Sequence, residues 1–126
     1  MGGVFIVKNG YKVAAYLRLS VEDGDKEVSD SIVSQKSIIE EKIKKLGREF
    51  ELYDFYIDDG YTGLNTDRPN FQRMLEDIER KKVNCVITKD LSRLSRNNFE
   101  ANYYIEIFFL EREIRYIAIL DNVDTY

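Results

Sequence analysis

An arginine and a serine stand two positions apart at the end of the first apolar run of the sequence. The run covers residues 12–17, lacks helical periodicity and predicts a strand buried on both faces, which Arg18 and Ser20 close. Because side chains alternate along a strand, both would point to the same side, roughly 6–7 Å apart. Open α/β sheets bind ligands at the carboxyl ends of their strands, so a guanidinium and a hydroxyl could meet a substrate there. On their own, these two residues favour the simpler interpretation of a strand that ends in a polar loop.

Arginines follow at two further places in the chain where an anion could bind. Arg68 precedes Pro69, which is expected to open a helix, and a residue before proline is driven into an extended conformation. Arg68 would be held at the helix N-terminus, whose unpaired N–H groups and partial positive charge disfavour an arginine unless an anion is bound. Arg93 and Arg96 follow the third apolar run, and as an isolated pair at helical spacing they would be surface residues.

A carboxylate and an amide lie near the same predicted strand ends. Asp58 follows the second apolar run, 50–57, in a turn that continues through Asp59 and Gly60. Gln35 falls one turn into the helix after the first strand, on the side of its apolar positions. A glutamine at such a place is by itself more typical of the edge of a buried face than of a site.

Apolar runs and amphipathic segments alternate along the chain and predict four strands and three helices. The strands are expected over residues 11–19, 50–57, 83–88 and 115–120, and the helices from a cap at Ser29 or Asp30 to Gly47, from Pro69, and from a cap at Asn97. Each crossover is long enough to return parallel. This pattern predicts an α/β fold, a three-layer, doubly wound, mostly parallel four-stranded sheet with helices on both faces. Three helices would leave part of the sheet uncovered, so we expect a missing C-terminal helix or a partner subunit.

Length and charge limit what the chain can be. Its 126 residues predict one domain, 1–126, with a loose arm over residues 1–10 and a loop over 21–28. The 19 Lys and Arg residues against 23 Asp and Glu residues give a net charge of −4. Because phosphate neutralisation supplies most non-specific affinity for nucleic acids, an acidic chain needs a local basic cluster or a further domain for that role.

The residue types that are absent or rare exclude several kinds of site. There is no histidine, and Cys85 is the only cysteine, inside an apolar run. These counts exclude disulfide scaffolds, cysteine-rich zinc sites and Ser–His catalysis. The glycines form no dinucleotide or Walker loop, so we expect no cofactor and no metal. The apolar part of the amino terminus is too short for a signal peptide or a membrane span, which predicts a soluble cytoplasmic protein with no membrane partner.

Parallel topology would bring the carboxyl ends of the first three strands to one edge of the sheet. Four arginines and a serine would gather there without a histidine, which favours a phosphodiester over a carbonyl as substrate. Guanidinium forks bind phosphate oxygens bidentately, and several forks stabilise a phosphoryl transition state better than one. A serine that attacks phosphorus forms a covalent phosphoserine, which conserves the bond energy for religation. No nucleotide cofactor is needed.

At these residues the sequence resembles the serine recombinases, the family of resolvases, invertases, large serine integrases and transposon recombinases. The resemblance extends over about residues 11–125 and rests on four motifs in the family's order. They are Tyr16-Leu17-Arg18-Leu19-Ser20 (the nucleophile motif), Ser31-Ile32-Val33-Ser34-Gln35 (a helix with an active-site glutamine), Asp58-Asp59-Gly60-Tyr61-Thr62-Gly63 with Arg68-Pro69-Asn70-Phe71, and Leu91-Ser92-Arg93-Leu94-Ser95-Arg96-Asn97.

The resemblance implies a site-specific recombinase that acts on double-stranded DNA of a mobile element. Ser20 would attack the DNA and leave a 5′-phosphoserine and a free 3′-hydroxyl, as a homodimer that exchanges strands within a tetramer. Arg18, Arg68, Arg93 and Arg96 would bind the scissile phosphate, with Gln35 and Asp58 in support. The family continues into a long dimerisation helix and DNA-binding domains, so the chain would be an excised catalytic domain.

Three departures from the family pattern bear on this assignment. Small resolvases place an aspartate directly before the first arginine of the pair, where this chain has Ser92, and the nearest acid is Asp90. Thr62 replaces the usual serine of the second motif. The loop over residues 21–30 is longer than in small resolvases, which favours the large integrase or transposon-type branch.

Two other functions are compatible with the same fold. A receiver-like regulatory domain could accept phosphate on paired aspartates, but receivers carry that pair after the first strand, and here Asp58 and Asp59 follow the second. A protein of the recombinase fold that shapes DNA without catalysis is the other alternative.

Overall fold

A computed structural model of the chain describes residues 10–20, 31–60 and 68–126, without the side chains of Ser20 and Asp59. The expected arm, the loop over 21–28 and Thr62 lie outside the described residues, apart from Gly10 at the end of the arm. The elements are β1 (Tyr11–Ser20), α2 (Ile32–Leu46), β2 (Phe50–Gly60), α3 (Pro69–Glu79), β3 (Cys85–Thr88), α4 (Leu91–Leu94), α5 (Asn98–Tyr103), a π-helical segment (Tyr104–Phe108), α6 (Phe109–Glu111), β4 (Arg115–Ala118) and β5 (Val123–Asp124).

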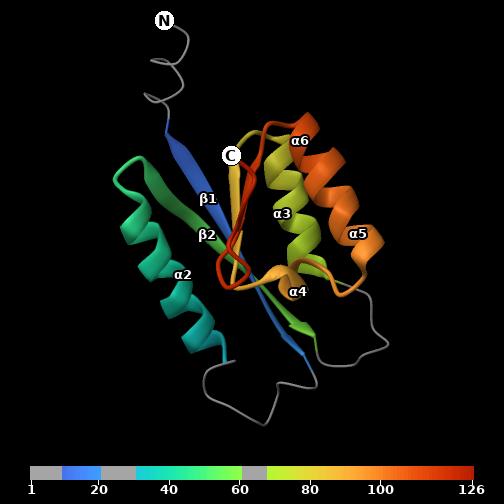
Figure 1. Cartoon of the computed structure of the whole chain (residues 1–126), viewed down its shortest axis with the longest axis horizontal. Coiled ribbons are helices and arrows are strands. Elements are labelled where there is room, and N and C mark those ends of the chain that lie inside the picture. Colours follow the sequence, from blue (N-terminus) through green and yellow to red (C-terminus); the bar gives the residue numbers. More distant parts are fainter. Residues whose placement is uncertain (1–9, 21–30, 61–67) are drawn as a thin grey trace, which may run out of the picture.

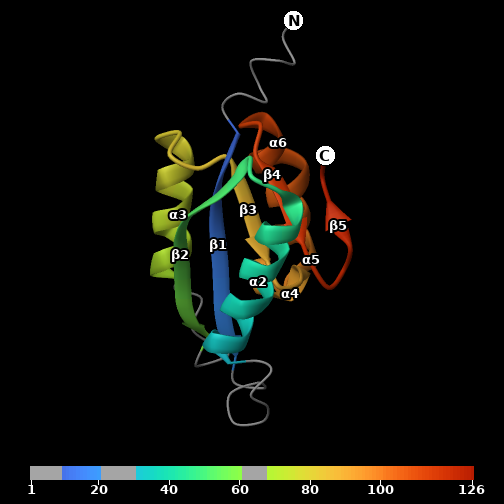
Figure 2. The same ribbon diagram turned by 90° about the vertical axis from the view of Figure 1, so that its left-hand side faces the viewer.

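The strands form one sheet in the order β2-β1-β3-β4-β5, with β1 near its centre (Figure 2). The first four strands are parallel, as the sequence predicts, and β5 pairs antiparallel with β4. The expectation of only four strands was therefore wrong by one short strand. Arg115 on β4 holds β5 through two hydrogen bonds to Asp124, from Nε to Oδ1 at 3.0 Å and from Nη2 to Oδ2 at 2.8 Å.

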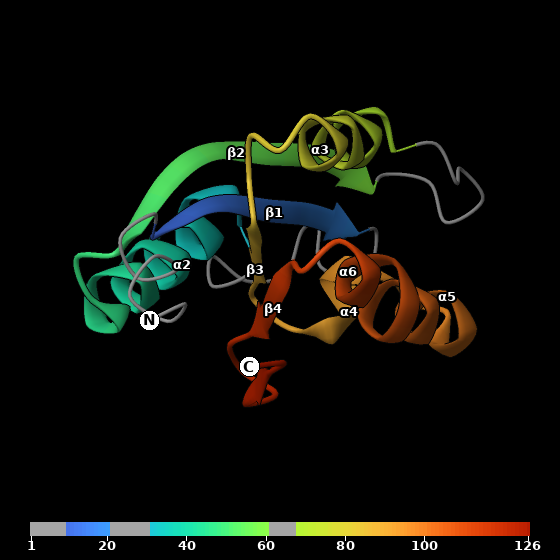
Figure 3. The same cartoon turned by 90° about the horizontal axis from the view of Figure 1, so that it is seen from above.

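Helices cover both faces of the sheet and give three layers (Figures 1 and 3). Helix α2 packs on one face, and α3, α5 and α6 pack on the other. Val13, Ala15 and Leu17 belong to the core under α2, whereas Ala14 and Tyr16 belong to the core on the opposite face. Because β1 is buried on both sides from Val13 to Leu17, it is apolar at each of these positions, until it reaches the sheet edge at Arg18.

The helix boundaries follow local capping chemistry. Ser31 caps α2 by accepting a hydrogen bond from the Ser34 N–H at 3.1 Å, so the expected cap at Ser29 or Asp30 was too early. Gly47 ends α2 with φ of +116°, a conformation that favours glycine. Asn97 caps α5, as predicted, and the helix then widens into the π-helical segment. In the part of the chain that the structure describes, no helix is both long and apolar enough to cross a membrane.

Cys85 is fully buried on β3, and this burial raises the pKa of its thiol to about 12. Only the thiolate reacts, so at pH 8 the reactive fraction in the folded protein is about 10⁻⁴. We therefore expect a thiol reagent to label the native protein at least about 100-fold more slowly than the protein unfolded in urea. Fast labelling of the native protein at pH 8 would show that the thiol is accessible.

Candidate active site

Arg18 brings a guanidinium to the carboxyl edge of the sheet. Its side chain is buried against the segment that follows β3, where Nε donates to the Arg93 carbonyl at 3.4 Å and Nη2 donates to the Ser92 carbonyl. Burial lowers the pKa of Arg18, and the charges of Arg96, Arg68 and Arg93 lower it further. Three positive charges beside a buried guanidinium create a positive potential. This position therefore favours a bound anion.

Arg93 in turn donates a hydrogen bond to the backbone of Arg18. It lies on α4, a single helical turn after β3, and its buried side chain donates from Nη1 to the Arg18 carbonyl at 3.1 Å. Its Nε lies 3.8 Å from Asp90 Oδ1, which also accepts a hydrogen bond from Ser92 Oγ at 2.6 Å. Each arginine thus fixes the backbone that carries the other, and the expectation for an isolated surface pair does not apply to Arg93.

Gln35 binds the same backbone carbonyl from the other face of the sheet. It is fully buried on α2, and its Nε2 donates to the Arg18 carbonyl at 3.3 Å. Two side chains from separate helices therefore hold the strand two residues before Ser20, which ends β1 and pairs with Gly60 on β2. Gln35 is therefore not at the edge of the buried face, as its position alone would suggest, and the carbonyl supplies the partner that a buried amide needs.

Asp58 joins β1, β2 and the start of α3. It pairs with Arg18 in the register of the two strands and is buried. Its carboxylate accepts hydrogen bonds from the Tyr16 hydroxyl at 2.8 Å and from the N–H groups of Asn70 and Phe71, each at 2.9 Å. Burial raises the pKa of Tyr16, so its hydroxyl remains a donor. Arg68 occupies the N-cap position of α3 without a capping hydrogen bond from its side chain. Asp58 accepts the first N–H groups of the helix in its place.

Arg68 stands at the N-terminus of α3 outside the helical conformation, as the following proline predicts, but with φ of −136° and ψ of 78° it is not fully extended. Its guanidinium stacks on the Phe71 ring, 3.8 Å from the ring centroid, and its Nη1 donates to the Leu94 carbonyl at 2.6 Å. Its Nη2 donates to Glu100 Oε1 at 3.3 Å. The guanidinium therefore reaches from α3 to the segment that carries Arg93.

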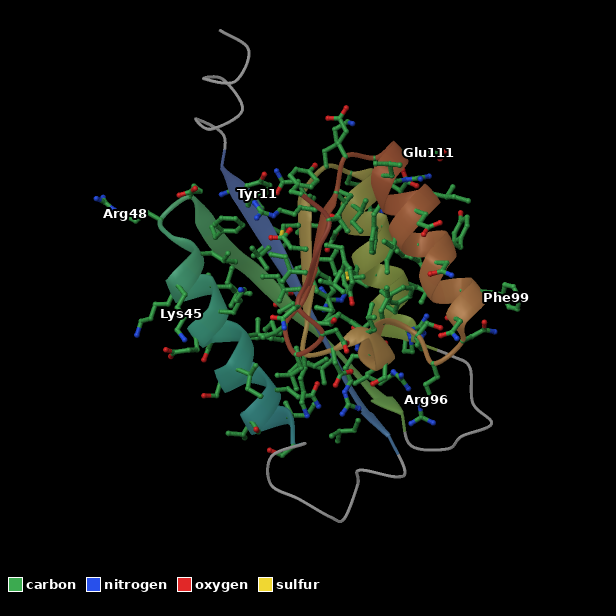
Figure 4. All side chains as sticks on the ribbon, in the orientation of Figure 1. Tyr11, Lys45, Arg48, Arg96, Phe99 and Glu111 are labelled. Atoms are coloured by element: carbon green, nitrogen blue, oxygen red, sulfur yellow. The ribbon has the colours of Figure 1, made fainter. Side chains whose placement is uncertain are left out.

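Arg96 is the exposed member of the arginine set. Figure 4 shows it beyond α4, near the carboxyl ends of β1 and β2. Together with Asp90 and Arg93 it lines an open hollow of about 770 Å³ between α4, α5 and the turn after β4. Its charge acts on Arg18, so all four predicted arginines belong to one electrostatic cluster.

Two contributors to this site were not singled out by their residue type. Tyr16 is part of the first apolar run, and its hydroxyl partner is on another strand. Glu100 lies on α5, and its partner Arg68 stands 32 positions earlier in the sequence. In the described part of the chain, no group of three or more acidic, cysteine or histidine side chains is arranged to hold a metal ion.

Comparison with known proteins assigns the family. The family profile described as "Resolvase, N terminal domain" matches residues 13–126. The chain belongs to this family of serine recombinases. A comparison with curated protein sequences gives no match.

Solved structures of serine recombinases resemble this domain. The N-terminal catalytic domain of TP901-1 integrase is 31% identical with a TM-score of 0.76, over 90% of this chain and 81% of that one. A resolvase family site-specific recombinase from Streptococcus pneumoniae is 28% identical with a TM-score of 0.73, over 90% and 75% of the two chains. The catalytic domain of ISC1926 TnpA, an IS607-like serine recombinase, is 23% identical with a TM-score of 0.66, over 86% and 70%, and supports the fold alone.

Proposed function

We propose that this chain is the catalytic domain of a site-specific DNA recombinase and that Ser20 is its nucleophile. Ser20 Oγ forms a bond to the scissile phosphorus as the bond from phosphorus to the 3′ oxygen breaks. The serine proton passes to a base and the 3′ oxygen gains one, which leaves a 5′-phosphoserine and a free 3′-hydroxyl. The observation that carries this proposal is the pair of reciprocal hydrogen bonds between Arg18 and Arg93, in which each guanidinium donates to the backbone carbonyl of the other residue. Arg18 stands two residues before Ser20.

The four arginines differ in burial, and we propose that they differ in role accordingly. Arg18 and Arg93 are buried and fixed, Arg68 is half-buried at the mouth, and Arg96 is exposed to approaching DNA. Guanidinium groups around the phosphorus stabilise the charge that spreads over the equatorial oxygens in the transition state. Gln35 and Asp58 support them, since one fixes the Arg18 backbone and the other fixes the start of α3 behind Arg68.

The phosphoserine retains the energy of the cleaved bond, so religation after strand exchange needs no cofactor. We propose double-stranded DNA of a mobile element as substrate, and a homodimer that assembles into a tetramer for the exchange. The acidic net charge of −4 supports the proposal that most DNA affinity resides in further domains of a longer protein, with residues 1–126 as its single catalytic domain.

The receiver-like alternative is disfavoured by the state of Asp58. Its carboxylate already accepts three hydrogen bonds from within the protein, two of them from the backbone of α3. A phosphate acceptor must present its oxygens to a ligand, which this buried carboxylate does not do.

Replacement of Arg93 with lysine tests the proposed chemistry. Lysine keeps the charge but has no planar fork, so it cannot hold the Arg18 carbonyl and a phosphate oxygen together. We expect Arg93→Lys to slow DNA cleavage about 100- to 1000-fold, the cost of one transition-state donor. DNA affinity should stay within about threefold, because phosphate contacts in the further domains dominate it.

The measurement uses the full-length protein and a duplex that carries its recombination site, with covalent adduct followed on denaturing gels and affinity by band shift. Arg80→Lys, at an exposed position on the opposite end of α3, is the matched control. Cleavage by Arg93→Lys within about threefold of wild type would refute a role in transition-state binding. A wild-type protein that binds the duplex without any adduct would favour the DNA-shaping alternative.

A further inference from the structure

Among the described residues, three carboxylates contact the arginines or their immediate supports, and they differ in how firmly they are held. Asp58 is buried and accepts three hydrogen bonds. Asp90 is held by the Ser92 hydroxyl at 2.6 Å and lies beside Arg93. Within the described ranges, the Glu100 carboxylate forms a hydrogen bond to Arg68 at 3.3 Å, and its side chain is 44% exposed. Of these three described carboxylates, Glu100 is the one that can move away from its arginine at the least cost in free energy.

Arg68 does not need Glu100 to keep its position. The following proline fixes its backbone, the Phe71 ring supports the face of its guanidinium, and the Leu94 carbonyl takes Nη1 at 2.6 Å. A long, half-exposed ion pair adds little to such an arrangement. What Glu100 does contribute is a negative charge at the outer edge of the guanidinium, where an incoming phosphate oxygen would have to bind.

We propose that Glu100 is a displaceable counterion of the phosphate site. In the free protein it occupies the Nη2 side of Arg68, and it moves away when a phosphodiester oxygen takes that place. A carboxylate oxygen and a phosphate oxygen accept the same N–H donor, so the two anions compete directly. This inference rests on the proposed function, because it takes Arg68 as a phosphate ligand.

The test measures binding of a single phosphodiester to the full chain. Thymidylyl-thymidine is titrated into protein labelled with ¹⁵N-arginine, and the dissociation constant is read from the side-chain signals by NMR. Glu100→Gln removes the negative charge that competes with the phosphate for Arg68. Because such partly exposed ion pairs are weak, we expect the variant to bind the dinucleotide about two- to fivefold more tightly than wild type. Glu106→Gln makes the same change of charge at an exposed position farther along the same helical stretch, and its affinity should match wild type.

The variant Arg68→Ala separates failure of the inference from failure of the proposed function. Affinity that is lost in Arg68→Ala and raised in Glu100→Gln alone supports the counterion. If Glu100→Gln binds equally or more weakly, or if Glu106→Gln gains as much, the counterion is refuted while Arg68 remains a phosphate ligand. If Arg68→Ala binds the dinucleotide as well as wild type does, the assignment of Arg68 under the proposed function is wrong, and the counterion is refuted with it.

Discussion

Replacement of Ser20 with alanine is expected to abolish the covalent adduct with DNA and to leave DNA affinity unchanged. The substitution removes the oxygen that bonds to phosphorus, and attack by water would form no link to the protein, so adduct formation should fall by more than about 10⁴-fold. The arginines should keep their places, because Arg93 and Gln35 bind the backbone carbonyl of Arg18, which the substitution leaves in place. The measurement is the yield of adduct on denaturing gels at equal occupancy of the DNA.

Ser37→Ala, at an exposed position on α2, provides the control for loss of a serine hydroxyl. It should form adduct at the wild-type rate. Adduct that persists in Ser20→Ala at a rate near wild type would place the nucleophile elsewhere in the chain. Circular dichroism of both variants checks that the fold is retained.

The sheet could be predicted because its signals are local and strong. Every residue from Val13 to Leu17 is apolar, and so short a run is typical of a strand buried on both faces. Pro69 and Gly47 mark helix ends by their own backbone preferences. Strand β5 gave no such signal. It has two residues, Val123 and Asp124, and its pairing depends on the contact with Arg115, which no periodicity encodes.

The placement of the arginines at one edge could also be predicted, since parallel strands must end together. The contacts that fix them could not. Arg18 and Arg93 each donate to the backbone carbonyl of the other residue, and carbonyls are the same for every residue type. The partner of Gln35 could not be predicted for the same reason, because it is the Arg18 carbonyl. Glu100 reaches Arg68 across 32 positions of sequence, a distance over which local patterns say nothing.

Asp58→Ala is expected to lower the free energy of unfolding by about 3–5 kcal/mol, because it leaves several buried donors without an acceptor. The Tyr16 hydroxyl and the N–H groups of Asn70 and Phe71 all lose their partner at once. Asp58→Asn retains one carboxamide oxygen and should recover part of the loss. Urea denaturation followed by circular dichroism measures both variants.

Asp54→Ala is the matched control on the same strand, since Asp54 pairs with Arg73 at 3.1 Å on the surface and should contribute no more than about 1 kcal/mol. A loss below about 1 kcal/mol in Asp58→Ala would mean that water replaces the carboxylate at this position. Cleavage by the folded variant should also slow, because the same N–H groups anchor the start of α3 that carries Arg68. Under conditions where Asp58→Ala is still folded, we expect its cleavage rate to fall at least about tenfold, with little change in Asp54→Ala. If the cleavage rate of Asp58→Ala falls only under conditions where the protein unfolds, the role of Asp58 is purely structural.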